Sequence, residues 1–387
     1  MTTLSKTPAP SRRGDHLLVA VKPGTEAALV ERQQVILPEL ARTVWRKGIV
    51  TFRLPSGFDP PDDFFPELFV AQAVIRSFGQ AVGASIDARA DAAVAIAGRG
   101  PWDAVHVWKR EPSVADRSAD AGTGDTEETE EEVAQAIRRR IEHASRDRAT
   151  AADTVPGDLV FDCIVDSTDR WWIGWHRGLT PVSCRPGGMH PLRDAAGKVS
   201  RAWLKLDEAI ATSGVRLAAG ERACELGASP GGACERLLEA GLRVVGIDPA
   251  LVDPRVAEHP RFEQWRMRAR DVKLKAFRGF DWFVADMNID PTSTMESLGR
   301  ILTAPGVRPK GVIATLKLPD WSRAAEIPGW LDRFREWGQT PIMTRQLSTG
   351  GREVCIVTEL RRQAPTRKPD LPRKPEAQAE RGVDDAP

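Results

Sequence analysis

From Ser200 onward, short apolar runs alternate with amphipathic segments, and this alternation predicts a doubly wound α/β sheet whose parallel strands are joined by helices. Several runs are apolar at nearly every position, which is typical of strands buried on both faces. Only "STGGR" separates the last two runs, too short for a crossover, so they are predicted to pair as an antiparallel hairpin. The expected strands are Arg222–Leu226, Arg243–Asp248, Phe262–Arg268, Phe280–Met287, Gly311–Leu318, Pro341–Leu347 and Glu353–Leu360.

The first half of the chain has a more mixed pattern, and residues 14–178 are predicted to form an α+β domain. Apolar and polar residues there favour strands at "HLLVAV", "GIVTFRL" and "AVHVW", and helices at "GTEAALVERQQ", "PELFVAQAVIRSF" and roughly Glu131–Arg146. The strands "LVFDCIVD" and "RWWIGWHR" then follow as a hairpin. Its tryptophans have two possible uses, stacking on nucleic-acid bases or filling a hairpin core, and the core is favoured.

Length and local composition set the domain boundaries. A chain of 387 residues with a net charge of +1 is long enough for two domains and gives no strong charge signal about partners. Residues 1–13 and 362–387 are rich in proline and charge and are predicted to be disordered tails. An acidic, low-complexity insert lies near 113–132, a glycine- and proline-rich linker covers 179–199, and the second domain covers 200–361.

The five cysteines contain no C-x-x-C pair and no nearby histidine set. The sequence therefore predicts neither a zinc site nor a disulfide framework. The first residues lack the apolar core of a signal peptide, and no stretch of eighteen apolar residues occurs. These features lead us to expect a soluble, cytoplasmic protein.

A glycine-rich turn, "ELGASPGG", joins the first strand of the second domain to a helix. It lacks the lysine of a P-loop and the middle glycine of the dinucleotide fingerprint, so neither a triphosphate nor a dinucleotide is expected. Glu225 before the turn would repel phosphate and suit a cation, while Asp248 ends the next strand, where acidic residues take ribose hydroxyls. A ligand with a ribose, a positive charge and no phosphate is S-adenosylmethionine (SAM). The residues expected to hold it are Glu225, Gly227, Ala228, Ser229, Pro230, Gly231, Gly232 and Asp248.

Ionisable residues are expected to meet at the carboxyl edge of the sheet, where ligands of doubly wound folds bind. Glu225, Asp248, Asp286 and Lys317 each end a parallel strand, and Glu353 begins the reversed strand on the same edge. Alone, each carboxylate could equally be a helix cap or a surface charge. Because Lys317 lies in an apolar strand, its pKa is expected to fall toward that of a general base, with Asp286 limiting the fall.

Several motifs occur in the order found in a known family. "SRAWLKLDEA", "ELGASPGG", "ADM", "TLKLP" and "REVCIV" resemble the FtsJ-like ribose 2′-O-methyltransferases over roughly Ser200–Leu360. The resemblance implies a Rossmann-like SAM methyltransferase with a Lys-Asp-Lys-Glu tetrad at Lys205, Asp286, Lys317 and Glu353. It also implies contacts of Asp271 with adenine and of Asp286 with the cofactor. From spacing alone, Lys205 would be a solvated lysine, free to pair with Glu208.

The two-domain arrangement resembles the bacterial large-subunit rRNA cytidine 2′-O-methyltransferase family, which has an N-terminal THUMP-type RNA-binding module. The resemblance implies methylation of an RNA ribose 2′-OH, in a cytidine of 23S rRNA, with Lys317 as base and no metal. Glu225 differs from the family, which has aspartate there, but keeps the charge.

Two other functions remain open on the sequence. An RNA-binding or ribosome-assembly factor could keep the fold without catalysis, although the complete tetrad argues against this. A SAM-dependent enzyme acting on small molecules or protein is the other, and it leaves the long first domain without a use.

Overall fold

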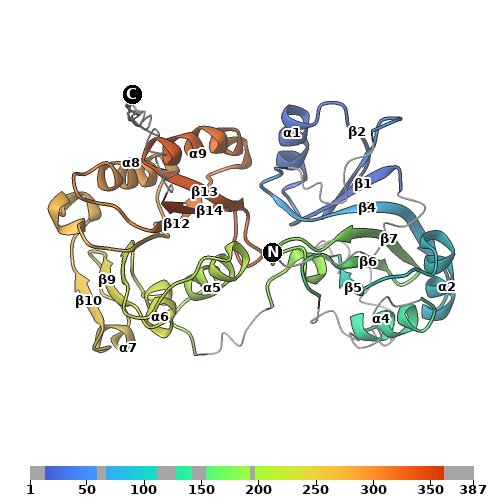
Figure 1. The fold of residues 1–387 in the computed structure, drawn as a ribbon, viewed down its shortest axis with the longest axis horizontal. Helices are drawn as coiled ribbons and strands as arrows, with labels where there is room; N and C mark the ends of the chain where they lie inside the picture. Colours follow the sequence, from blue (N-terminus) through green and yellow to red (C-terminus); the bar gives the residue numbers. More distant parts are fainter. Residues whose placement is uncertain (1–13, 59–66, 111–127, 142–153, 192–196, 361–387) are drawn as a thin grey trace, which may run out of the picture.

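The computed structural model describes residues 14–58, 67–110, 128–141, 154–191 and 197–360. They form two seven-stranded sheets, each with its own helices, that lie side by side (Figure 1). Within these ranges no helix has the length and apolar character needed to cross a membrane. The predicted tails and most of the predicted acidic insert lie outside the described residues.

The first sheet has the strand order β2-β3-β1-β4-β7-β6-β5 and is antiparallel except for the pair of β5 and β6. Helix α1 packs on the β1 side of this sheet, and α2 and α4 pack on the β5 to β7 side. The strands are β1 (His16–Val21), β2 (Ala41–Arg46), β3 (Ile49–Arg53), β4 (Ala71–Val82), β5 (Ala104–Lys109), β6 (Leu159–Ser167) and β7 (Arg170–Arg177). The helices are α1 (Glu26–Ile36), α2 (Ile86–Ala97) and α4 (Glu130–Arg138), and a 3-10 turn, η2, follows at Pro186–Gly188.

The second sheet has the order β10-β9-β8-β11-β12-β14-β13 and confirms the predicted doubly wound α/β fold. All strands run parallel except β14, which lies between β12 and β13 and is antiparallel to both. The strands are β8 (Arg222–Leu226), β9 (Arg243–Ile247), β10 (Phe262–Trp265), β11 (Trp282–Ala285), β12 (Gly311–Lys317), β13 (Gln339–Arg345) and β14 (Glu353–Leu360).

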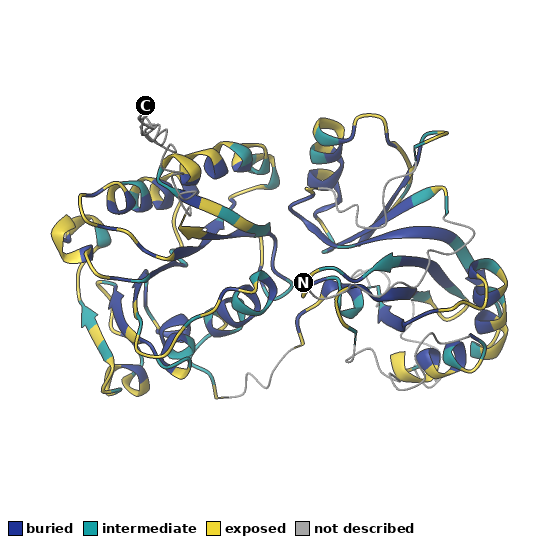
Figure 2. Cartoon of the chain, in the orientation of Figure 1, coloured by how far each residue is buried: buried dark blue, intermediate teal, exposed yellow. Residues whose placement is uncertain are grey.

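Helices cover both faces of this second sheet, and the strands between them are mostly buried (Figure 2). One face packs on α5 (Ala202–Ser213), α6 (Gly232–Glu239) and α7 (Pro254–Ala257). The other packs on α8 (Pro291–Leu302), α9 (Ile327–Glu336) and the 3-10 turns η3 (Ala269–Asp271), η4 (Leu274–Phe277) and η5 (Trp321–Glu326). The sheet is therefore enclosed between two apolar layers.

The helix predicted at "PELFVAQAVIRSF" is wrong, because that stretch contributes to β4. Its alanine and glutamine residues favour a helix locally, but β4 is a central strand between β1 and β7. Burial on both faces and two ladders of backbone hydrogen bonds outweigh that local preference. Strand β2 and helix α2 were not predicted. The helix predicted at Glu131–Arg146 begins one residue earlier and ends at Arg138, followed by a turn, and residues 142–146 lie outside the described residues.

The predicted linker is only partly a linker, because residues 182–190 pack between the domains. Turn η2 contacts β4 and β5, and the buried Arg345 of β13 donates to the Oε1 of Gln72 at 3.1 Å and to the carbonyl of Gly188 at 3.4 Å. The Lys22 ammonium donates to the carbonyls of Ser348 and Gly350 at 2.7 and 2.6 Å. Polar contacts therefore hold the β13–β14 hairpin against the first domain.

Gly188 tests this packing. It has a φ of 64°, and a Cβ there would lie 1.9 Å from the carbonyl oxygen of Gln72. We expect Gly188→Ala to lower the free energy of unfolding by about 1–3 kcal/mol more than Gly214→Ala. Gly214 is the matched control, since its φ is 74° and no atom lies within 4 Å of the added Cβ. Equal losses in urea unfolding would contradict the tight packing of η2.

Candidate functional site

Four charged side chains from four elements meet at the carboxyl edge of the second sheet. Lys317, at the end of β12, places its Nζ 2.6 Å from Asp286 Oδ1 and 2.5 Å from Glu353 Oε2. Lys205, on α5, places its Nζ 3.3 Å from Asp286 Oδ2 and 3.0 Å from Glu353 Oε1. The two ammonium groups and two carboxylates thus form a closed, neutral group, which we term the tetrad.

The tetrad owes its geometry to the reversed strand. Because β14 is antiparallel to β12, Glu353 at its beginning is the register partner of Lys317 at the end of β12. Asp286 directly follows β11, which pairs in parallel with β12. Side chains from three adjacent strands therefore reach one point on the edge.

The expected fall in the pKa of Lys317 is wrong for this arrangement. Burial lowers the pKa, but Asp286 and Glu353 together outweigh burial and raise it above its ordinary value. Burial likewise raises the pKa of Glu353, and Lys205 and Lys317 more than reverse this, so it is lowered. In the free protein the Lys317 amine is thus held as an ammonium.

Lys205 is not the solvated lysine that spacing alone predicts. Only 15% of its side chain is exposed, and its ammonium contacts the tetrad carboxylates rather than Glu208. Glu208 is buried and accepts from the backbone N–H of Ser348 at 2.7 Å and of Thr349 at 2.8 Å. The same helix therefore supplies one tetrad member and fixes the β13–β14 loop.

Glu225, at the glycine-rich turn, is a buried carboxyl. Its Oε2 has no hydrogen-bond partner among the described residues. Burial raises the pKa of Glu225 to about 8, with hydrogen bonds from Cys234 acting against the rise and Asp286 and Asp248 adding to it. The carboxyl is close enough to the tetrad to sense Asp286, and it has an unused acceptor.

The turn itself needs glycine at its corner. Gly231 has a φ of 114° and is the N-cap of α6, and an added Cβ would meet Val256 at 3.1 Å. Asp248 organises the turn, since its Oδ2 accepts from the Ser229 N–H at 3.2 Å and its Oδ1 from the Ala250 N–H at 2.8 Å. A carboxylate has further lone pairs, so Asp248 can still accept from a ligand.

Asp271, expected on the adenine, ends η3 with 60% of its side chain exposed and lies 4.0 Å from Arg270 Nε. Its closest described ion pair thus involves its chain neighbour rather than the tetrad. A cofactor role for Asp271, and the catalytic and cofactor roles of the other site residues, stay predictions.

Away from this edge, the tryptophans of the first domain are of two kinds, buried and exposed. The tryptophans of "RWWIGW" are buried in the first domain, which confirms the core interpretation. Trp45, on the edge strand β2, is exposed instead, with the Arg42 guanidinium 4.9 Å from its ring centroid. It was missed because β2 has no strong apolar period.

Buried polar residues near the domain contact were also missed. Asp207 of α5 accepts from Arg236 Nε at 2.8 Å and lies 2.9 Å from His190 Nε2. His190 belongs to the segment after η2, so this pair ties that segment to α5. No sequence signal pairs residues this far apart.

A family model described as FtsJ-like methyltransferase matches residues 198–316. Ribosomal RNA large subunit methyltransferase M of Xylella fastidiosa (strain 9a5c) is 34% identical over 152 residues, which are 38% of this chain and 42% of the relative. The protein of that name from Halorhodospira halophila is 33% identical over 169 residues, 42% of this chain and 47% of the relative. The matched part therefore spans less than half the length of either relative.

Among solved structures, the Methanococcus jannaschii fibrillarin pre-rRNA processing protein is similar with a TM-score of 0.35 and 13% identity, covering 57% of this chain and 87% of that one. The residues matched by the family model contain the glycine-rich turn, Lys205 and Asp286, and they end directly before Lys317. Over residues 198–316 the chain is therefore similar to the FtsJ-like methyltransferases.

Proposed function

We propose that the protein transfers a methyl group from SAM to a ribose 2′-OH of RNA, most specifically a cytidine of 23S rRNA in the cytoplasm. The observation that carries the proposal is the tetrad of Lys205, Asp286, Lys317 and Glu353 beside a glycine-rich turn that is flanked by two carboxyl groups and lacks the lysine of a P-loop. The names of the curated relatives support ribosomal RNA as the substrate class.

The residues at the turn fit SAM. The buried Glu225 Oε2 is an unused acceptor suited to a cationic ligand, and Asp248 stands where ribose hydroxyls are commonly bound. Gly227 and Gly231 have φ values of 82° and 114°, which favour glycine and allow the tight turn to form. When bound, SAM supplies a methyl group already activated by its positively charged sulfur.

The chain must then position the 2′-OH and receive its proton. Lys317 begins as an ammonium held by two carboxylates, so it can accept a proton only after their hold weakens. A cation bound beside Asp286 opposes the positive charge of Lys317 and lowers the pKa of its amine. We propose that Lys317 is the base in this loaded state and that Lys205 orients the hydroxyl.

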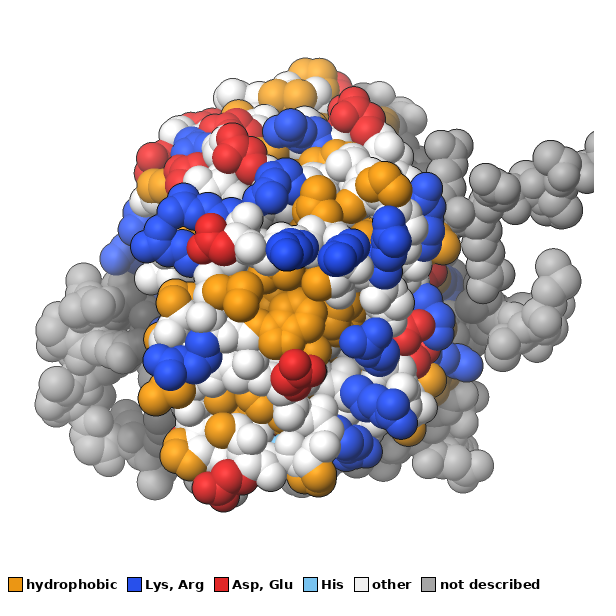
Figure 3. All heavy atoms as spheres, turned by 90° about the vertical axis from the view of Figure 1, so that its left-hand side faces the viewer, with side chains coloured by type: hydrophobic (Ala, Val, Ile, Leu, Met, Phe, Trp, Pro, Cys, Tyr) orange, Lys and Arg blue, Asp and Glu red, His pale blue; other side chains and the backbone are white. Residues whose placement is uncertain are grey.

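A basic segment supports RNA as the substrate. Residues 261–278 contain seven Lys or Arg against two acidic residues, and all seven cations are exposed. One of them directly precedes the edge strand β10 and the other six follow it. Figure 3 shows Lys and Arg gathered around an apolar patch on this side. Arg266 and Arg268 follow the carboxyl end of β10, which is parallel to β9, so they share an edge with Asp248. Such a surface suits phosphate backbones.

We propose that the first domain, residues 14–178, is a THUMP-like RNA-binding module. Its exposed Trp45 and the adjacent Arg42 offer a stacking surface of the kind that unpaired bases use. The alternative function is an inactive RNA-binding or assembly factor that keeps the fold. Methyl transfer from labelled SAM to total RNA separates the two.

The first prediction here concerns Glu225. Between pH 4.5 and about 8 the folded chain holds a proton on Glu225 that the unfolded chain has released, so this carboxyl lowers stability as pH rises. We expect the stability of Glu225→Gln relative to wild type to increase with pH across this window, by up to about 1.4 kcal/mol per pH unit. Above about pH 8 this difference should stay constant. The measurement is urea unfolding read by pulse proteolysis of the second domain. Glu258→Gln, at an exposed site, is the control, and parallel profiles for all three proteins would refute the assignment.

The second prediction concerns the base. Lys317→Ala should slow methyl transfer by about two to four orders of magnitude without weakening SAM binding, because it removes an ammonium that opposes the cationic ligand. Lys317→Arg should fail nearly as badly, because a guanidinium stays protonated at neutral pH. Lys310→Ala, which removes an exposed lysine just before β12, should keep full activity. If the arginine variant stays active in single-turnover assays, Lys317 acts only as a positive charge.

The third prediction concerns the basic segment. Replacing Arg266 and Arg268 together by Glu should weaken RNA binding and reduce the slope of log K against log salt by about 1.4, since two phosphate contacts are lost. The matched control replaces Arg333 and Arg335 by Glu, because these two arginines are exposed and have the same spacing on α9. Equal salt slopes for the two double variants, measured by filter binding, would exclude the β10 side as an RNA surface.

A further inference from the structure

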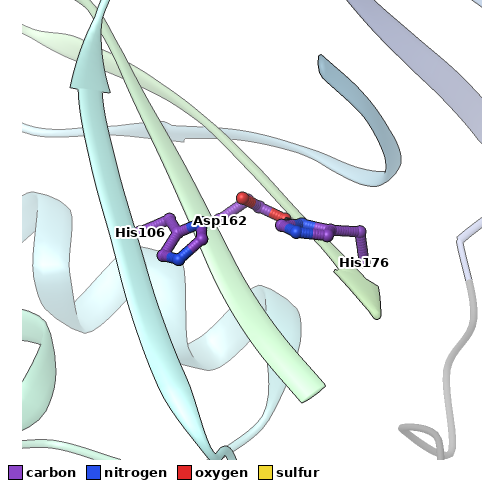
Figure 4. A group of neighbouring side chains, drawn as sticks. All are labelled: His106, Asp162 and His176. Carbon is purple, nitrogen blue, oxygen red and sulfur yellow. Dashed lines mark hydrogen bonds and ion pairs between the residues drawn. The ribbon is translucent and has the colours of Figure 1, made fainter. Parts of the chain in front are cut away.

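Three potential metal ligands lie together in the first domain, away from the tetrad. His106, Asp162 and His176 come from β5, β6 and β7, and one ligand atom of each lies within 4.8 Å of the others (Figure 4). The register explains this: His106 pairs with Asp162, and Val160, two residues before Asp162, pairs with His176. Paired residues, and residues two apart on a strand, share a face of the sheet.

Two atoms in this cluster are buried without a partner among the described residues. They are His106 Nδ1 and Asp162 Oδ1, and both residues are 0% exposed. A buried polar atom without a hydrogen bond destabilises the folded state, and this cluster contains two of them. Both atoms are good ligands for a divalent metal ion.

The far side of each imidazole is already held by an oxygen. His176 Nε2 lies 2.7 Å from the carbonyl oxygen of Ser183, and His106 Nε2 lies 3.0 Å from the Thr154 hydroxyl. This leaves the Nδ1 atoms turned toward Asp162, with His176 Nδ1 at 2.5 Å from Asp162 Oδ2. Metal-binding histidines have this arrangement, with an outer oxygen fixing the ring while the other nitrogen binds the ion.

We propose that His106, Asp162 and His176 bind a divalent transition-metal ion of the zinc type. Two imidazole nitrogens and one carboxylate oxygen supply three protein ligands, which leaves a position for water. Asp162 and His176 also line a small cavity with Ser183 and Gly188, on the side where residues 182–190 pack. The ion would tie three strands together and, through the Ser183 carbonyl on His176, fix the segment that leads to the second domain.

The site is independent of the proposed methyl transfer, and it was not predicted from the sequence because its ligands are spread over seventy residues without a motif. The cysteines play no part in it: Cys163, next to Asp162, points to the opposite face of β6 and packs in the core beneath α2 and α4.

The test is zinc binding by the full chain. Protein from zinc-supplemented cells, after desalting, should contain about one equivalent of zinc by plasma mass spectrometry, and cobalt substitution should give the visible absorption of a nitrogen- and oxygen-ligated ion. Asp162→Asn, which keeps the side-chain volume, and His106→Ala should each lose the zinc. His16→Ala is the control, because His16 also lies beside a carboxylate, Asp15, but at the surface.

A milder variant guards against misfolding. Thr154→Val removes the hydroxyl that lies beside His106 Nε2, and we expect zinc affinity by calorimetry to fall about 10–100-fold with the fold intact. No zinc in the wild-type protein, or equal zinc in wild type and Asp162→Asn, would overturn the proposal. The second outcome would assign bound zinc to thiols elsewhere.

Discussion

The mutual neutralisation of the four tetrad charges is the constraint on which the second domain depends. Each of these side chains is at least 79% buried, and a lone charge at that depth is strongly destabilising. The charges are tolerated only because every ammonium meets both carboxylates. Helix α5 and strands β11, β12 and β14 must therefore be in register before any of these residues can be buried.

The reversed strand β14 is what makes this neutralisation possible. A parallel strand beside β12 would place its beginning at the opposite edge, far from Lys317, whereas the antiparallel β14 begins beside it. The loop before β14 is held by hydrogen bonds to Glu208 of α5 and to Lys22 of the first domain. The first domain thus contacts the chain three residues before Glu353, so the domain interface and the tetrad share one short loop.

The strands of the second sheet could be predicted because burial on both faces leaves continuous apolar runs, as at Gly311–Lys317. The prediction failed where local preference and tertiary contacts oppose each other. The sequence of β4 is rich in helix-favouring residues, but its central position in the sheet makes it a strand. The predicted direction of the Lys317 pKa shift was wrong for a related reason. An apolar strand indicates that the lysine is buried, but the sequence does not show how many carboxylates contact its ammonium. His106, Asp162 and His176 meet only through the pairing of three strands, which no local pattern encodes.

Glu225 and the tetrad differ in how they meet the cost of burial. The tetrad is neutral because its charges cancel. Glu225 instead has no cationic hydrogen-bond partner among the described residues, and it stays neutral by keeping its proton up to about pH 8. On the proposed function, a cationic ligand provides the missing partner and Glu225 becomes ionised when the ligand binds. Binding then releases a proton below pH 8, so ligand affinity is linked to pH even though the ligand's charge does not change.

The same incoming charge opposes the ammonium of Lys317 across Asp286, which couples filling of the turn to the loss of a proton from the proposed base. A phosphate ligand would have the reverse effect on both groups, which is why a carboxyl at this turn selects a cation.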